Sequence, residues 1–181
     1  VTKKLNYLKL DIDRLESPLY IIAKENCFGK LFRWRDNVKI LNLGSLNVDI
    51  TYLVDHVVAP GETIKASRRE RFCGGKGLNQ SIALAKAGAQ VYHAGCIGRD
   101  GEMLSAMLRS AGVDIRFLEQ VDEPSGHAII QVDEKGQNSI VIYGGANACV
   151  TREYIDQVIA NFDCGDVLLL QNEISNIDYA I

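Results

Sequence analysis

A glycine-rich segment that carries two side-chain donors is the sharpest chemical feature of the sequence. It covers residues 74–80 and has three glycines in four positions. Glycines at this spacing let the backbone come very close to another group, and the free N–H groups of a helix that starts here favour negative or hydrogen-bonding ligand atoms. Lys76 and Asn79 add side-chain donors at the same place. A tight turn into a helix is the alternative, and the phosphate-binding pattern G-x-x-x-x-G-K-[ST] does not occur.

Acidic and amide side chains follow two apolar, strand-like runs. Asn47 and Asp49 come shortly after the run at 38–43, and in an extended chain they point the same way. Glu173 comes shortly after a second run, at 166–170. Open α/β sheets place ligands at the carboxyl ends of their strands, and a carboxylate beside an amide suits a polyhydroxylated ligand. An Asx-type turn at Asn47 and a solvated loop acid at Glu173 are the competing interpretations.

Two kinds of strand that could position these side chains are interleaved along the chain. Apolar strands that alternate with helices indicate a parallel α/β sheet. The strands of this sheet are expected at 38–43, 91–97 and 166–170, with a further strand candidate at 115–121. The helices, with caps at Asp100 and Thr151, are expected at 77–87, 101–111 and 151–162. Strands without intervening helices indicate a separate small antiparallel sheet, and these are expected at 50–58, 64–72, 127–132 and 139–143. The predicted fold class is therefore α/β with a second, smaller sheet.

The composition is that of an ordinary globular protein, and it excludes several classes. The 181 residues are 47% hydrophobic with a net charge of -3, which argues against disorder. No apolar run reaches the roughly 18 residues of a membrane helix, and the five cysteines form no C-x-x-C pair. We therefore expect a cytoplasmic protein with reduced thiols and no membrane partner. His56, His93 and His127 are isolated, so we expect no metal site in this chain.

The first 36 residues differ in character from the rest. Residues 1–40 carry nine Lys+Arg against five Asp+Glu, a net of +4, whereas residues 41–181 carry eleven against eighteen, a net of -7. A packing arm is one interpretation, and a basic element that touches nucleic acid or a partner is the other; the modest charge excess favours the packing arm. We treat this segment as an extension of unknown role. Its apolar residues with a helix-like spacing are Leu5, Leu8, Ile12 and Leu15.

Six short motifs taken together resemble the N-terminal half of the ribokinase family of sugar and nucleoside kinases. In chain order they are GSLNVD, APGET, GGKGLNQ, GCIGRDGEM, GGAN and QNE, and the match covers about residues 38–178. The resemblance implies that residues 37–181 are the N-terminal part of a ribokinase-like domain. Its parallel-sheet core would be incomplete here, and a small antiparallel β-sheet lid would be formed by strands at about 50–72 and 126–143.

The resemblance also implies a sugar site and a partner. A homodimer through the lid sheet is expected, and nucleic acid is not. The residues that match the family's sugar-binding positions are Asn47, Asp49, Gly74, Gly75, Lys76, Asn79, Ala128 and Glu173, with Ile130 as a further lid contact.

The activity implied is ATP-dependent phosphorylation of the 5-hydroxyl of D-ribose, with ATP, Mg²⁺ and a monovalent cation such as K⁺ as cofactors. This transfer demands positioning, exclusion of water and neutralisation of phosphate charge. The family's catalytic aspartate lies in a late motif resembling D-T-x-G-A-G-D, which does not occur before Ile181. We therefore expect the chain to hold the sugar site and no catalytic residue, and to be inactive by itself.

Two alternatives stay open from the sequence. One is a kinase for another pentose or a nucleoside, because the donors and carboxylates favour a small polyol without ranking the pentoses. The other is a non-catalytic sugar-binding or regulatory module. A parallel sheet that stops near Glu173 would expose an apolar edge, so we also expect dimerisation or aggregation.

Overall fold

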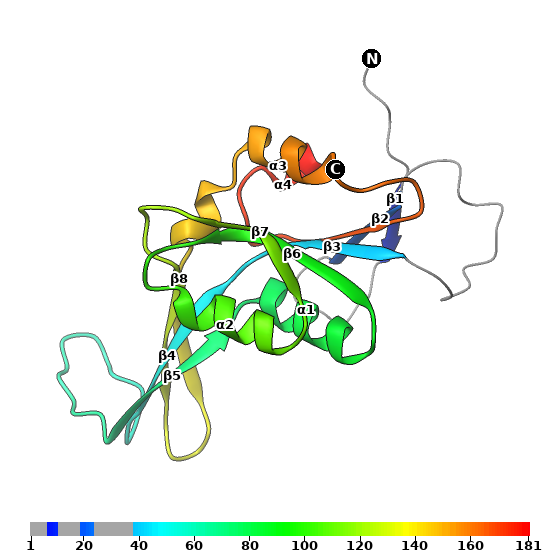
Figure 1. Ribbon diagram of the computed structural model, residues 1–181. Coiled ribbons are helices and arrows are strands. Elements are labelled where there is room, and N and C mark those ends of the chain that lie inside the picture. Colours follow the sequence, from blue (N-terminus) through cyan, green and yellow to red (C-terminus); the bar gives the residue numbers. More distant parts are fainter. Residues whose placement is uncertain (1–6, 11–18, 24–37) are drawn as a thin grey trace.

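The computed structural model describes residues 7–10, 19–23 and 38–181, and it has two sheets (Figure 1). A six-stranded core sheet carries helices on both faces, and a four-stranded lid sheet projects from one end of it. The core strands in spatial order are β1 (Tyr7–Leu10), β2 (Leu19–Ala23), β10 (Val167–Gln171), β3 (Lys39–Leu43), β6 (Gln90–Ile97) and β7 (Asp114–Gln120). The lid strands in spatial order are β5 (Arg68–Gly74), β4 (Asn47–Leu53), β8 (Gly126–Val132) and β9 (Asn138–Tyr143).

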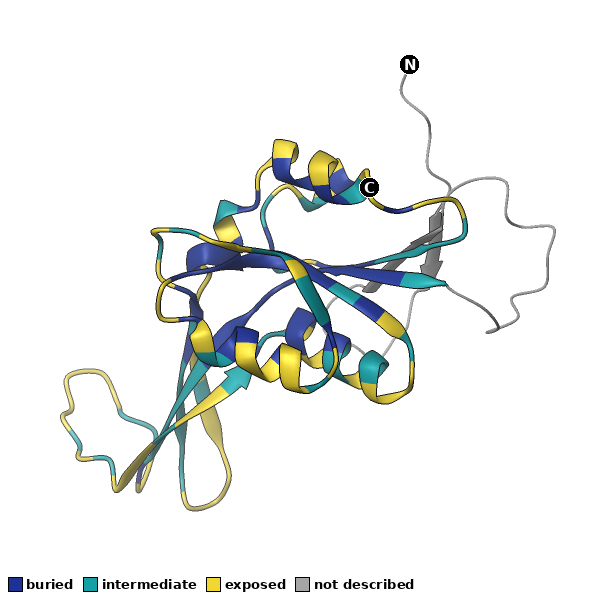
Figure 2. Cartoon of the chain, viewed as in Figure 1, coloured by how far each residue is buried: buried dark blue, intermediate teal, exposed yellow. Residues whose placement is uncertain are grey.

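Helices cover both faces of the core sheet, with α1 and α2 on one side and α3 and α4 on the other (Figure 1). Their bounds are α1 Lys76–Lys86, α2 Glu102–Ser110, α3 Arg152–Ile159 and α4 Ile177–Ala180, and a 3₁₀ turn covers Gly145–Cys149. Leu41 and Leu43 of β3 pack towards Ile155 of α3, whereas Val91 of β6 packs with Leu78 of α1. Strands β3 and β6 are largely buried between the two helix layers (Figure 2), which confirms the predicted α/β class.

The lid sheet is mixed, so the prediction of an antiparallel lid is wrong in one pairing. β4 pairs with β5 and β8 with β9 in antiparallel fashion, but β4 and β8 are parallel. The reason lies in how the chain enters the lid. β4 follows β3 directly and β8 follows β7, so both leave the carboxyl ends of parallel core strands and run outwards together, while β5 and β9 run back (Figure 1).

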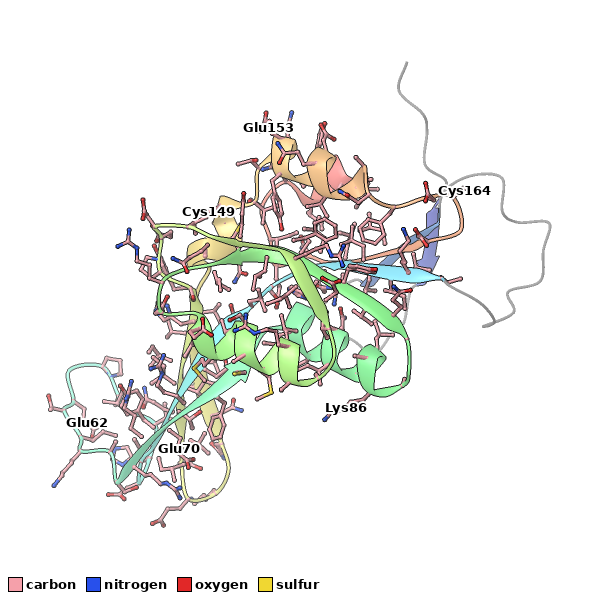
Figure 3. All side chains as sticks on the ribbon, viewed as in Figure 1. Glu62, Glu70, Lys86, Cys149, Glu153 and Cys164 are labelled. Atoms are coloured by element: carbon pink, nitrogen blue, oxygen red, sulfur yellow. The ribbon has the colours of Figure 1, made fainter. Side chains whose placement is uncertain are left out.

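The first lid hairpin lies closer to the core than the sequence predicted. Its strands were expected at 50–58 and 64–72, but they are Asn47–Leu53 and Arg68–Gly74, paired from Asn47 opposite Gly74 to Leu53 opposite Arg68. The Pro-Gly turn exists at the tip, where the Glu62 N–H donates to the Ala59 carbonyl over 3.0 Å. Glu62 and Glu70 mark this outer part of the lid in Figure 3. The shift moves Asn47, Asp49 and Gly74 from loops into strands.

The N-terminal segment joins the core sheet, contrary to its helix-like spacing. Tyr7–Leu10 is a strand that pairs with β2, and β2 pairs antiparallel with β10. Leu8 therefore lies in a strand, and Leu5, Ile12 and Leu15 lie outside the described residues. The expected exposed edge at β10 is wrong as well, because β10 lies between β2 and β3. An open strand edge offers a row of backbone donors and acceptors. Hydrogen bonding to such an edge stabilises the strand more than a weak helical pattern stabilises a helix.

Two local expectations at Asp100 and Cys164 are also wrong. Asp100 does not cap α2, because its carboxylate accepts from the Ser125 N–H over 2.9 Å, whereas the Thr151 hydroxyl caps α3 as predicted. Cys164 is disulfide-bonded. The free thiols within residues 38–181 are Cys73, Cys96 and Cys149.

His93 is a fully buried histidine in the middle of the core sheet. It lies in β6 with 0% exposure, and its Nδ1 is 2.8 Å from the Ser81 hydroxyl oxygen of α1. Burial lowers the pKa of His93 from 6.5 to about 4, with a smaller opposing contribution from the Gly44 backbone. The imidazole is therefore neutral near pH 7, and it makes folding sensitive to acid.

We predict that stability falls with acid through His93. Between pH 6.5 and about pH 4 the unfolded chain binds a proton at this position and the folded chain does not. The free energy of unfolding should therefore drop by about 3 kcal/mol as the pH falls through this window. Urea unfolding of the wild type and of His93→Phe at several pH values measures the difference. His56→Phe, in an exposed lid loop, is the control; an equal pH slope in the wild type and His93→Phe would contradict the prediction.

Candidate functional site

The glycine-rich segment forms the start of α1 and rests against the turn between β3 and β4. Gly75 precedes the helix with φ 98°, and no side chain caps it. A Cβ on Gly75 would lie 2.7 Å from the Ser45 carbonyl oxygen, and one on Gly77 only 2.5 Å from the Ser45 nitrogen. Leu78 N–H donates to the Ser45 carbonyl over 3.0 Å. Only glycine permits this approach. It points the first N–H groups of the 11-residue helix at acceptors within the chain, and the Lys76 N–H donates to the Glu173 carboxylate over 3.5 Å.

Glu173 reaches this helix start from the loop after β10. Its carboxylate is 2.5 Å from the Lys76 ammonium and accepts from the Ser45 hydroxyl over 2.6 Å. Partial burial would raise the pKa of Glu173, but the hydrogen bonds from Lys76 and Ser45 outweigh it, so the pKa lies below the ordinary 4.5. Glu173 is therefore an ionised, oriented acceptor next to an ammonium donor.

Asp49 faces the same place from the lid. It lies in β4 between Phe72 of β5 and Ala128 of β8. Its Oδ2 is 2.1 Å from the position of a Cβ on Gly74, so a side chain at Gly74 would displace the carboxylate. Burial, and then the charge of Glu173, raise the pKa of Asp49 above 3.8. Two carboxylates thus share one site, with their pKa values moved in opposite directions.

An asparagine that the sequence did not single out joins the lid to the core. Asn147 of the GGAN motif accepts from the Leu46 N–H over 3.0 Å and donates to the Leu46 carbonyl over 3.2 Å. It also donates to Asn47 Oδ1 over 2.8 Å. Gly126 packs against both amides, because a Cβ there would lie 2.1 Å from Asn147 and 2.3 Å from Asn47. Asn147 therefore sets the orientation of Asn47 where β4 enters the lid.

The structure brings most of the predicted site residues together at the junction of core and lid. Asp49, Gly74, Gly75, Lys76 and Glu173 are linked by the contacts above. Asn47 and Ala128 lie on the same face of the lid sheet as Asp49, and Ala128 is buried. Ile130 lies on that face two residues further out. Asn79 is exposed one turn into α1, and its N–H donates to the Gly75 carbonyl over 3.0 Å.

Sequence reasoning missed Ser45 and Asn147 as site residues. Ser45 holds both Glu173 and the Gly77 N–H, the latter over 3.3 Å. Both residues lay inside quoted motifs, but a serine in a turn and an asparagine after two glycines have many ordinary roles. Their partners are 128 and 100 residues away in sequence, so spacing gave no signal.

The site can bind a neutral, polyhydroxylated ligand. Carboxylates of Asp49 and Glu173 can accept hydrogen bonds from hydroxyls, and the side chains of Lys76 and Asn79 can donate to ligand oxygens. In the described ranges, no three His, Cys, Asp or Glu side chains gather closely enough to hold a metal ion. Among the described helices, none is long and apolar enough to span a membrane.

Comparison with known proteins agrees with this geometry. The family described as "pfkB family carbohydrate kinase" matches residues 37–178. The chain is 37% identical to a ribokinase of Haemophilus influenzae over 134 residues, which is 72% of this chain and 44% of that protein. It is 33% identical to a deoxyribokinase of Salmonella typhi over 135 residues, which is 73% of this chain and 44% of that protein.

A solved structure shows the same arrangement in space. The ribokinase of Arabidopsis thaliana, complexed with ribose and ATP, is similar with a TM-score of 0.58 and 33% identity, over 65% of this chain and 42% of that one. The chain thus spans less than half the length of these relatives. The family match covers most of the chain, and the fold agrees with it. The chain belongs to the pfkB family of carbohydrate kinases and is ribokinase-like within it.

Proposed function

We propose that the complete protein is an ATP-dependent kinase that phosphorylates D-ribose at the 5-hydroxyl, and that the residues described above bind the sugar. The convergence of Asp49, Lys76 and Glu173 carries this proposal. Membership of a carbohydrate kinase family and the ribose named in the Arabidopsis structure support it.

Each part of the site has a task in holding a pentose. Asp49 and Glu173 accept from sugar hydroxyls, while the side chains of Lys76 and Asn79 donate to sugar oxygens. Ala128 and Ile130, on the lid face that carries Asp49, lie against the apolar side of the ring. The lid then keeps water from the 5-hydroxyl, which phosphoryl transfer requires.

The nucleotide part of the reaction is proposed for the complete protein. The late glycine-rich motif with the catalytic aspartate does not occur in these 181 residues. ATP would bind with Mg²⁺, and a monovalent cation such as K⁺ would support it, as the family resemblance implies; the ATP named in the Arabidopsis structure supports the nucleotide. A protein that uses ATP in this way is proposed to act in the cytoplasm.

A specific observation favours one alternative substrate. A deoxyribokinase is nearly as similar to this chain as the ribokinases are. The second candidate is therefore a kinase for deoxyribose, which lacks the 2-hydroxyl that ribose offers to a carboxylate.

We predict that the 181-residue chain binds D-ribose and that Asp49→Asn weakens binding about tenfold or more, because an amide replaces a charged acceptor. Isothermal titration calorimetry measures the dissociation constant. Asp55→Asn, an exposed carboxylate in the lid loop, is the matched control and should bind like the wild type. Tighter binding of deoxyribose or a nucleoside than of ribose would reverse the substrate ranking, and equal affinity of Asp49→Asn and wild type would remove Asp49 from the site.

We predict that the 181-residue chain does not turn over ribose, because no catalytic base is present. A coupled assay for ADP release with ribose and Mg-ATP measures this. Robust turnover would contradict the assignment of the base to a later motif. The same assay on the complete protein tests the kinase itself: ribose binding without turnover there would favour the sugar-binding or regulatory module.

We propose a homodimer through the lid sheet. The two edge strands of the lid sheet expose large apolar side chains: Val141 67%, Ile142 64%, Tyr143 50% and Ile140 48% on β9, and Phe72 49% on β5. Phe72, Ile140 and Ile142 share one face of the sheet, as the strand register shows. Apolar surface gathered in this way is typical of an interface.

We predict that Ile142→Glu disrupts this dimer, because a charge would be buried at its centre. Light scattering should give twice the chain mass of 20.0 kDa for the wild type and a single chain mass for the variant. Lys135→Glu, in the exposed turn between β8 and β9, is the control and should stay dimeric. A monodisperse monomer for the wild type would refute the dimer.

A further inference from the structure

Behind the sugar site, the core contains a row of buried polar side chains that sugar binding does not use. We call it the buried polar chain, and its members are the buried His93, Ser81, Asn42 and Gln171 and the partly buried Gln80. Asn42, Ser81 and His93 are 0% exposed and Gln171 is 1% exposed. Such groups are costly to bury without partners, so their placement calls for an explanation.

Strand register brings these residues to one face of the core sheet. Asn42 of β3 lies opposite His93 of β6 and opposite Leu169 of β10. Gln171 is two residues beyond Leu169, so it points to the same side. Ser81 lies on the buried side of α1, which covers this face. Three strands and one helix therefore meet in this row.

The hydrogen bonds of the buried polar chain run in one direction. Gln171 Nε2 donates to Gln80 Oε1 over 2.6 Å and to Asn42 Oδ1 over 2.7 Å. Asn42 Nδ2 donates to the Ser81 hydroxyl over 2.9 Å. Since Ser81 accepts this bond, its own proton is directed to His93 Nδ1 over 2.8 Å. These four hydrogen bonds link the row from Gln80 to His93, whereas the buried His93 Nε2 and Gln171 Oε1 have no hydrogen-bond partner among the described residues.

The buried polar chain lies directly behind Lys76 and Glu173, which bind the sugar in our proposal. Asn42 Nδ2 also donates to the Gly77 carbonyl over 2.8 Å, and Gly77 follows Lys76. Gln171 accepts the Glu173 N–H at its own carbonyl over 2.9 Å. Little free space exists here, since a Cβ on Gly44 would lie 2.0 Å from Gln171 Oε1.

We propose that Asn42 and Gln171 are positioning residues for the sugar site, which fix the start of α1 and the loop after β10 so that Lys76 and Glu173 stay paired. Apolar side chains could fill the same volume, but they would leave the Gly77 carbonyl without its partner and remove the directional link between β10 and α1. The proposal rests on the proposed function for the identity of its ligand.

The test compares Asn42→Leu and Gln171→Met with Leu41→Ala. Leu41 is the neighbour of Asn42 on β3, but it packs in the cluster on the α3 side. Leu41→Ala should lower the melting temperature at least as much as Asn42→Leu does, so it controls for lost stability. Gln171→Met removes the hydrogen bonds that Gln171 donates to Asn42 and Gln80. It keeps the test informative if Asn42→Leu folds poorly.

Two readouts are expected to move in the polar variants alone. Amide hydrogen exchange at residues 77–79, relative to that in α2, should speed up about tenfold in Asn42→Leu and Gln171→Met and stay unchanged in Leu41→Ala. The dissociation constant for D-ribose should rise about tenfold in the same two variants, and change less than about twofold in Leu41→Ala.

The outcomes separate this proposal from the proposed function. Wild-type exchange in both polar variants would overturn the positioning role, as would an equal loss of ribose affinity in Leu41→Ala. If the wild type binds no ribose, the proposed substrate fails, but faster exchange at residues 77–79 in the polar variants alone would still support the positioning role.

Discussion

The start of α1 lies so close to the turn between β3 and β4 that no side chain fits between them. Gly75 and Gly77 meet the backbone of Ser45 at distances that no Cβ tolerates. This contact decides where Lys76 and the first turn of α1 point. Since β10 runs parallel beside β3, its loop delivers Glu173 to the same spot. One steric constraint between two backbone segments thus sets the geometry of the candidate site.

The lid depends on the same junction. β4 and β8 leave the core in the same direction, and Asn147 ties the entrance of β4 to the 3₁₀ turn that follows β9. Asp49 is carried on this lid, whereas Glu173 belongs to the core. Burial raises the pKa of Asp49, while the hydrogen bonds from Lys76 and Ser45 lower that of Glu173. A ligand held between them would contact one carboxylate with a raised pKa, Asp49, and one with a lowered pKa, Glu173.

The buried polar chain gives the core a second role besides packing. A strand with Leu41 and Leu43 on one face and Asn42 on the other serves two layers at once. The apolar face holds α3 through area burial, which has little direction. The polar face holds α1 through hydrogen bonds, which fix orientation. The start of α1 is thereby oriented, while α3 adds to its packing the Tyr154 hydroxyl, which accepts from the Gly95 N–H over 2.8 Å and donates to the Phe117 carbonyl.

The sequence by itself determined the α/β class, most helix and strand positions and the motif residues of the site, because local spacing of apolar residues and glycines encodes them. It misplaced the N-terminal strands and the parallel pairing of β4 with β8, and it did not reveal the roles of Ser45, Asn147 and Asn42. Those depend on partners about 30 to more than 120 residues away. Only the tertiary structure decided them, since hydrogen bonds between distant segments leave no periodic trace in the chain.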